Sequence, residues 1–174
     1  MSASLQASVL APTASGPAAA AAVAFEPEFI LLLQEIIEQH VPFNRVLGLQ
    51  ATEITPAAVA GRITMRPDLV GSVAHQRLHG GVISAALDSM AGLAIMAAIA
   101  ARHMDEPPAR RLQRFTRLGT IDLRVDYLRQ GVGTEFRLGA RVLRLGSRVA
   151  STQMECLGSD GELIATGAAA YIVS

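Results

Sequence analysis

The sequence has no lysine and no tryptophan, a single cysteine, and only 4% aromatic residues. Its 15 basic residues, all arginine, are matched by 15 acidic residues, so the formal net charge at pH 7 is zero. Proteins that bind nucleic acid usually carry a basic excess for the phosphates and aromatic side chains on which bases stack. The lack of both argues against a nucleic-acid partner.

The cysteine content also limits the chemistry. Cys156 stands alone, which excludes an intramolecular disulfide and a cluster of thiolate ligands and fits the reducing cytoplasm, where we expect the protein to be. His75 and His79 have a helical metal-site spacing, but no acidic residue lies between them and no third ligand is evident. Because zinc takes three or four ligands, we expect no metal site and no cofactor.

The first 25 residues are rich in Ala, Ser and Pro and contain no charged side chain. A secretory signal needs a basic region ahead of its apolar stretch, so we expect residues 1–25 to be a disordered tail and residues 26–174 to form a single domain. Residues 82–101 are long and apolar enough to span a membrane. Asp88 in their middle would be costly in lipid, so we predict a buried core helix and no membrane partner.

Hydrophobic spacing predicts the order of the elements. The predicted elements are a helix at 26–40, strands at 45–50 and 57–65, a long helix from 80 to 102, a polar loop at 104–116, and strands at 121–127, 136–142, 148–156 and 163–173. In the clearest strand, Ile121, Leu123, Val125 and Tyr127 alternate with polar residues, which indicates one buried face. Short connections imply antiparallel neighbours. We therefore predict an α+β fold in which a curved antiparallel sheet wraps one long central helix.

The start of the long helix, His79-Gly80-Gly81, carries the strongest chemical signal. Paired glycines let another group approach the backbone, and the N–H groups of the first helical turn can hold an oxyanion. Two turns further on, Asp88 is an acid in an apolar helix and a candidate general base or nucleophile. The alternative is a structural carboxylate satisfied by a hydroxyl such as that of Ser89 or Thr120.

The spacing of Gly81 and Asp88 has a geometric consequence. The two residues lie on nearly one face of the helix but about 10.5 Å apart along its axis. One carbonyl cannot comfortably contact both, so a shared reacting atom requires the two groups to come from different subunits. A working enzyme therefore predicts a homodimer.

With the segment 119–128 (GTIDLRVDYL), this motif resembles the hotdog-fold acyl-CoA thioesterases of the phenylacetate-pathway (PaaI-like) group, over residues 43–173. The resemblance implies a hotdog fold and subunits that join their sheets into homodimers with shared active sites, which commonly pair into homotetramers. It also implies hydrolysis of small or medium, aliphatic or aromatic acyl-CoA, with coenzyme A entering only as part of the substrate.

The resemblance also implies residue roles. Asp88 would activate water or attack the thioester directly, the Gly81 N–H would hold the carbonyl oxygen, and His79 would shape the turn. Thr120 takes the place of a hydroxyl residue that orients the water. The family usually has an asparagine in the loop before the histidine, where this chain has Ser72 and Val73. This departure supports the alternative function, a non-catalytic acyl-CoA-binding hotdog module.

Substrate contacts are expected from the glycine loop and from arginines suited to the phosphates of coenzyme A. The predicted contact residues are Gly80, Ser72, Gln76, Ser89, Arg129, Arg144 and Arg148. The loop at 104–116 and the residues after it gather further arginines that either meet a phosphate or are simply solvated, namely Arg110, Arg111, Arg114 and Arg117.

Overall fold

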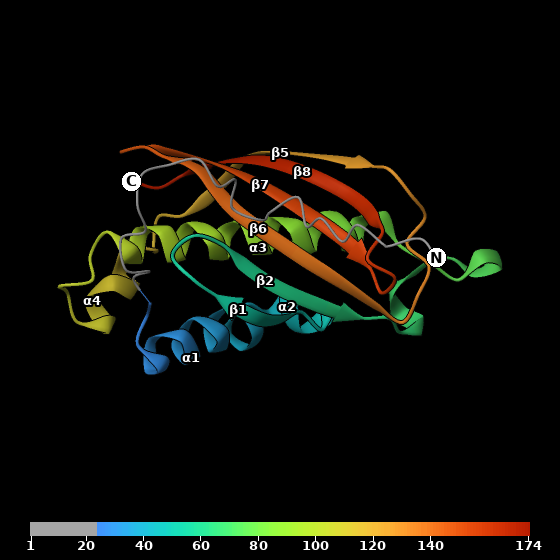
Figure 1. Cartoon of the computed structure of the whole chain (residues 1–174), viewed down its shortest axis with the longest axis horizontal. Helices are drawn as coiled ribbons and strands as arrows, with labels where there is room; N and C mark the ends of the chain where they lie inside the picture. Colours follow the sequence, from blue (N-terminus) through green and yellow to red (C-terminus); the bar gives the residue numbers. More distant parts are fainter. Residues whose placement is uncertain (1–23) are drawn as a thin grey trace, which may run out of the picture.

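The computed structural model describes residues 24–174 (Figure 1). The expected tail therefore lies outside the described residues except for Ala24 and Phe25. Phe25 is buried and packs edge-on against Phe29, with ring centroids 5.4 Å apart. The core thus begins one residue before the expected boundary.

The chain starts with three consecutive helical segments. These are α1 (Pro27–Glu35), the π-helical turn η1 (Ile36–His40) and α2 (Pro42–Leu47). The first two correspond to the predicted helix, and Phe29, Leu33 and Ile37 are its buried residues. The predicted strand at 45–50 is wrong. Pro42 ends one helix but also begins the next, because its fixed φ suits the first helical turn, and α2 ends only at Gly48, whose φ is +68°.

An antiparallel sheet forms the body of the molecule. Its six strands are β1 (Gln50–Ile54), β2 (Val59–Thr64), β5 (Gly119–Tyr127), β6 (Glu135–Leu145), β7 (Val149–Gly158) and β8 (Leu163–Ile172). Their order across the sheet is β1-β2-β6-β7-β8-β5. The predicted strand at 57–65 and the last four predicted strands are confirmed. The predicted buried face of β5 holds only in part, because Ile121 and Tyr127 are exposed.

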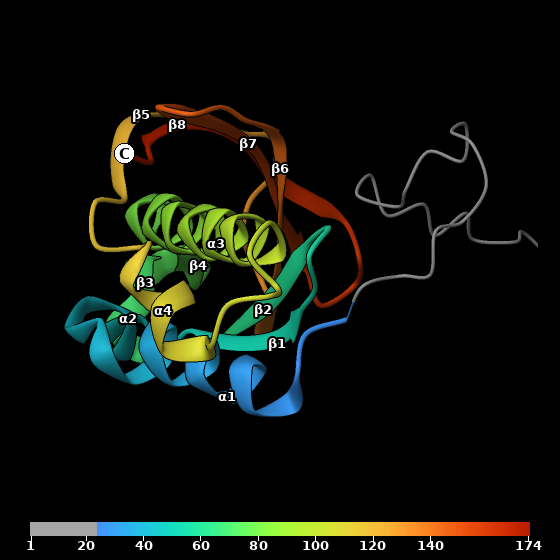
Figure 2. The same ribbon diagram turned by 90° about the vertical axis from the view of Figure 1, so that its left-hand side faces the viewer.

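The sheet curls around α3 (Gly80–Ala101), as Figure 2 shows in end view. Of the described helices, α3 is the one long and apolar enough to cross a membrane, but 67% of its most apolar window is buried inside the fold. Gly61 lets β2 approach this helix, since a Cβ there would lie 2.9 Å from the Met90 sulfur. The predicted α+β architecture with one central helix is confirmed.

Besides α2 and β1, which replace the predicted strand at 45–50, five short elements were not predicted. Before α3 lie η2 (Pro67–Leu69), β3 (Val70–Ser72), η3 (Val73–His75) and β4 (Arg77–Leu78), and the predicted loop at 104–116 contains α4 (Pro108–Gln113). Strands β3 and β4 form a separate two-stranded sheet. Segments of two or three residues are too short to show a hydrophobic period.

The two edges of the main sheet differ. At β1, the Ala51 N–H donates to Glu38 Oε1 over 2.8 Å, and the Ala51 carbonyl accepts from Gln34 Nε2 over 3.0 Å. Side chains of α1 and η1 thus occupy the groups that an added strand would use, which is a common way to block an edge. At the other edge, β5 pairs with β8 and with no second strand among the described residues. Within residues 24–174, the β5 edge is therefore the one open to another strand.

Candidate active site

A pocket of about 360 Å³ lies at the start of α3. It is bounded by the β3–β4 segment, the first turn of α3, the end of β5 and the residues that follow β5. Four of the predicted site residues line it, namely Ser72, His79, Gly80 and Arg129. The structure therefore brings together three of the residues predicted for the glycine loop and one of the predicted arginines, whereas Gly81 and Gln76 do not line the pocket.

His79 is the N-cap residue of α3 and holds its first turn. Its Nδ1 accepts a hydrogen bond of 2.8 Å from the Gly81 N–H. The backbone packs tightly here, because a Cβ on Gly71 would come within 2.7 Å of His79 Cα. The N–H predicted to hold the thioester oxygen is thus engaged by the imidazole. A carbonyl oxygen can take that bond only if the exposed His79 ring turns away.

Tyr127 is a pocket residue that sequence reasoning missed. Its hydroxyl donates to the Gly80 carbonyl over 2.9 Å, and a Cβ on Gly80 would approach its ring to 3.3 Å. The helix start and β5 therefore pack closely at Gly80, where a side chain would displace the Tyr127 ring by a few tenths of an ångström. Tyr127 ends the predicted strand at 121–127, and the alternation pattern assigned it to the core instead of the pocket.

Asp88 is the centre of a second polar cluster, two turns along α3. Thr120 Oγ1 donates to Asp88 Oδ1 over 2.9 Å. The Tyr171 hydroxyl lies 2.5 Å from the same Oδ1 and 2.7 Å from the Asp88 carbonyl oxygen. Burial, followed by the contact with Asp88, raises the pKa of Tyr171, so this hydroxyl remains a protonated donor. Nothing in the sequence singled out Tyr171.

Within one chain the two groups are separate. Neither Asp88 nor Thr120 lines the pocket at the helix start. Gly80 and Asp88 are eight residues apart on a continuous helix, which corresponds to about 12 Å along the axis. A single chain therefore presents two parts of the predicted site that do not meet.

Two of the predicted contact residues have local structural bonds. Ser89 Oγ donates to Asn44 Oδ1 over 2.7 Å, and Asn44 Nδ2 donates to the Ile37 carbonyl over 2.8 Å, which ties α3 to α2 and η1. Gln76 has a φ of +47°, and its Nε2 donates to the Val73 carbonyl. Neither residue lines the pocket. The Ser89 hydroxyl bonds Asn44 and not the Asp88 carboxylate.

The predicted arginines lie in different places. Arg129 lines the pocket and pairs with Glu162. Arg144 and Arg148 are exposed at the β6–β7 turn, near the C-terminal end of α3, where Arg102 donates to the Leu145 carbonyl. Within one chain they lie at the end of the central helix opposite the pocket.

The arginines of the predicted loop are partly engaged elsewhere. Arg111 is fully buried and contacts both carboxylate oxygens of Glu26. Arg114 pairs with Glu106. Arg111 cannot reach a phosphate, because its guanidinium is enclosed beneath α1 against the Phe29 ring.

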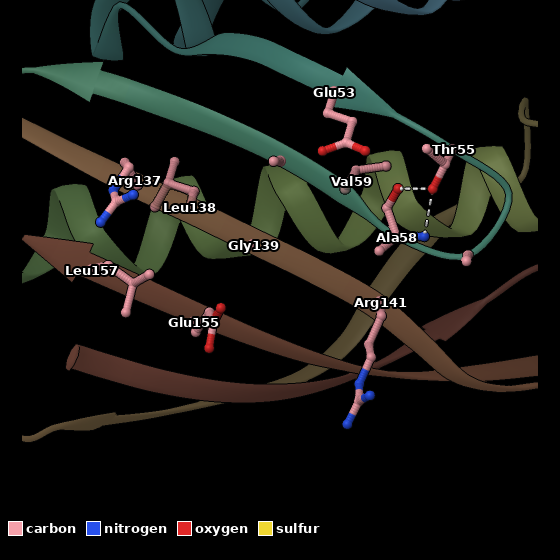
Figure 3. A pocket seen from close by; sticks show the side chains of 12 residues that line it. Glu53, Thr55, Ala58, Val59, Arg137, Leu138, Gly139, Arg141, Glu155 and Leu157 are labelled. Carbon is pink, nitrogen blue, oxygen red and sulfur yellow. Dashed lines mark hydrogen bonds between the residues drawn. The ribbon is translucent and has the colours of Figure 1, made fainter. Parts of the chain in front are cut away.

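A second hollow, of about 540 Å³, lies on the outer face of the sheet over β1, β2, β6 and β7. Figure 3 views it with α3 behind the sheet. Burial raises the pKa of Glu155 in this hollow, and the charge of Arg141 opposes the shift. None of the predicted site residues lines it. It is larger than the pocket at the helix start but faces away from Asp88.

The Cys156 thiol is not part of either cluster. Burial raises its pKa to about 12, which makes it a poor nucleophile. Among residues 24–174, no group of three or more His, Cys, Asp or Glu side chains is placed to hold a metal ion.

A curved antiparallel sheet around one central helix, with a pocket at the helix start and a carboxylate two turns beyond it, defines the hotdog class of folds. A model of the thioesterase superfamily matches residues 75–165. The medium/long-chain acyl-CoA thioesterases YigI of Salmonella typhimurium and Escherichia coli K12 are 40% and 38% identical over 152 residues, 87% of this chain and 98% of each relative. The chain belongs to the thioesterase superfamily. The resemblance to hotdog-fold acyl-CoA thioesterases is therefore confirmed.

Solved structures agree with this assignment. A protein from Shewanella oneidensis related to the thioesterase superfamily is 38% identical, with a TM-score of 0.79 over 86% of this chain and all of its own. Thioesterase superfamily member 2 from Mus musculus, at 20% identity, has a TM-score of 0.67 over the same share of this chain and its own full length. The second comparison concerns the fold alone.

Proposed function

We propose that this protein is an acyl-CoA thioesterase that hydrolyses medium- to long-chain acyl-CoA to the free acid and coenzyme A. The observation that carries the proposal is the arrangement of the Asp88 carboxylate. Its Oδ1 accepts hydrogen bonds from Thr120 and Tyr171, and its Oδ2 has no hydrogen bond in the described part of the chain. The names of the curated relatives support the substrate class and favour longer chains than the small or medium ones expected from sequence.

The reaction needs only water and groups of the protein. Asp88 Oδ2 accepts a proton from water, and the water oxygen forms a bond to the thioester carbon. The electron pair of the carbonyl moves onto its oxygen, which the N–H groups at the start of α3 stabilise. When the carbonyl re-forms, the C–S bond breaks and the thiolate takes the proton from Asp88. We propose no metal and no cofactor, and coenzyme A enters as part of the substrate.

The alternative route is a direct attack by Asp88 Oδ2 on the thioester carbon. Label in the protein after a single turnover in ¹⁸O-water shows an Asp88–acyl anhydride that water opens at the aspartyl carbon. Water activated by Asp88 puts the label into the released acid, and label confined to the acid excludes that opening. We propose the water route.

We propose further that the active site is shared between two subunits. The start of α3 in one subunit and Asp88 of the partner subunit would face the same thioester, because the two groups of one chain are too far apart along the helix. The free β5 edge supports this arrangement. Antiparallel pairing of two β5 strands would continue the sheet and set the two α3 helices side by side in opposite directions. A homotetramer, as the resemblance implies, would join two such dimers.

The engaged Gly81 N–H is consistent with this arrangement. A thioester oxygen entering the pocket would displace the His79 imidazole and take over its bond. Among the predicted pocket residues, Ser72 is the hydroxyl that would stand in for the family's asparagine, and Arg129 is the arginine that would meet a phosphate of coenzyme A.

Thiol release tests the proposed activity. The purified protein is assayed with short, medium, long and aromatic acyl-CoAs beside Asp88→Asn, which keeps the size of the side chain but removes the base. We expect turnover of medium and long chains and a loss of about 10²- to 10⁴-fold in kcat for the variant. If the native protein releases no thiol while acyl-CoA raises its thermal midpoint, the non-catalytic binding module replaces the enzyme.

We propose a cytoplasmic location and no nucleic-acid or membrane partner. The free, buried thiol of Cys156 fits a reducing compartment, and the apolar α3 has a place in the core of the fold.

A further inference from the structure

Tyr171 is a buried polar group that the proposed reaction does not itself use. Its side chain projects from β8 to the inner face of the sheet and is 3% exposed. Its single hydroxyl proton is shared between two oxygens of Asp88, one on the backbone and one on the side chain. The same contact therefore fixes both the position of α3 at Asp88 and the orientation of the carboxylate.

Thr120 reaches the same carboxylate oxygen from the neighbouring strand. Thr120 and Tyr171 are directly opposite each other in the β5–β8 pairing. The register shifts between Thr120 and Asp122, which leaves Ile121 as the extra residue of a β-bulge. Regular alternation from Leu123 would turn Thr120 outward, and the bulge turns it inward to Asp88. Bulges often re-aim a side chain beside a functional site.

The two donors leave the two carboxylate oxygens unequal. An ionised carboxylate has about two acceptor positions on each oxygen. Two hydroxyls fill those of Oδ1, and Oδ2 stays available to a water or substrate. Because the terminal torsion of an aspartate is soft and roughly two-fold, the carboxylate would rotate more freely without these donors.

We propose that Tyr171 is the principal positioning residue of Asp88, and that together with Thr120 it locks Oδ1 and makes Oδ2 the reacting oxygen. This inference rests on the proposed thioesterase function. Tyr171 has the larger part because it is enclosed, so no water can replace its hydroxyl. Thr120 donates to one oxygen of Asp88, whereas the Tyr171 hydroxyl contacts two.

The test measures kcat and KM for the native protein, Tyr171→Phe, Thr120→Val and the double variant on the best acyl-CoA. Tyr171→Phe removes one oxygen atom and keeps the ring. We expect its kcat to fall about 10- to 100-fold while KM changes less than about 2-fold, because misplaced catalytic groups slow the chemical step. Thr120→Val should have a smaller effect, and the double variant should lose less than the product of the two, because both act on one oxygen.

Thr166→Val is the matched control, because Thr166 lies on β8 but belongs to the alternation that faces away from α3. It should leave kcat unchanged. A Tyr171→Phe protein that keeps its thermal midpoint and its full kcat overturns the proposal. So does a loss of activity that only follows the loss of folded protein.

If Tyr171→Phe does not fold, Thr120 decides the question. A drop in kcat for Thr120→Val that Thr120→Ser restores supports the lock on Oδ1, and an unchanged kcat in Thr120→Val overturns it. Failure of the proposed function looks different, because the native protein itself would then release no thiol from any acyl-CoA.

Discussion

At the scale of single residues, the inner face of the sheet contains two weak acids that keep their protons in the folded chain. Burial raises the pKa of Cys156 to about 12, and burial together with Asp88 raises that of Tyr171. In the unfolded chain both groups ionise at lower pH. The folded state therefore binds more protons than the unfolded state in alkaline solution.

This difference predicts an alkaline loss of stability. The stabilisation that the protonated Cys156 thiol gives the folded state is fully present below pH 9.0, the ordinary pKa of a thiol. It is lost as pH rises toward the raised pKa of about 12. Each such group lowers the free energy of unfolding by about 1.4 kcal/mol per pH unit in its window. Urea unfolding from pH 8 to pH 11 should show a shallower decline for Cys156→Ala than for the native protein. Parallel declines would contradict the assignment.

The site residues differ in how far the sequence could reveal them. His79, Gly81 and Asp88 share one helix, so their spacing alone placed them relative to one another. Tyr171 is 83 residues away from Asp88 in the chain, and its strand pattern indicated only a buried face. Thr120 faces inward because of the bulge at Ile121. A regular alternation of inward and outward side chains does not predict where a bulge reverses that alternation.

At the scale of elements, a buried arginine joins α4 to the start of α1. The Arg111 guanidinium is fully buried, lies 4.0 Å from the Phe29 ring centroid, and bonds both Glu26 oxygens. A backbone hydrogen bond and then the bond to Arg111 lower the pKa of Glu26. The stabilising effect is thus present above the ordinary carboxyl pKa of 4.5 and is lost as pH falls below it.

Glu26→Gln should lower the thermal midpoint at pH 7, because it leaves the Arg111 charge buried without its counter-ion. The difference in thermal midpoint between this variant and the native protein should narrow as pH falls below 4.5 toward the lowered pKa of Glu26, where Glu26 becomes protonated in the native chain as well. Glu28→Gln is the control on the exposed side of the same helix turn. Equal thermal midpoints for Glu26→Gln and Glu28→Gln would show that the pair does not hold α1.

The elements were predictable in proportion to their length. The 22 residues of α3 form one long apolar run, and the four strands β5 to β8 carry long alternating patterns, and all five were found. The segment at 45–50 was assigned to a strand because its six residues are compatible with either period, and the helical geometry is set by Pro42 and Gly48 at its ends. The small β3–β4 sheet is held in place by backbone hydrogen bonds from Leu78 to Gly131 and from His79 to Leu69, which no local pattern encodes.

At the scale of the whole molecule, one sheet edge is blocked by helix side chains and the other is free. The free edge belongs to β5, the strand that carries Thr120 beside Asp88. A dimer formed along β5 would complete both the sheet and the site. We therefore propose a thioesterase whose active sites each take the helix start from one subunit and Asp88 from the other.

Heterodimers isolated through two affinity tags test this claim. One chain carries Asp88→Asn and the other Gly81→Pro, which removes the N–H in the first helical turn and moves the His79 imidazole, because a Cβ there would lie 2.9 Å from His79 Nδ1. Each variant alone should be inactive. The mixed dimer contains one complete site and one doubly defective site, so it should recover about half of the native thiol-release rate.

The reciprocal heterodimer pairs a native chain with a chain that carries both substitutions. Shared sites predict that it is inactive, because each site then contains one defect. Sites confined to single chains predict the reverse, half activity here and none in the first heterodimer. That reversed result would contradict the shared active site.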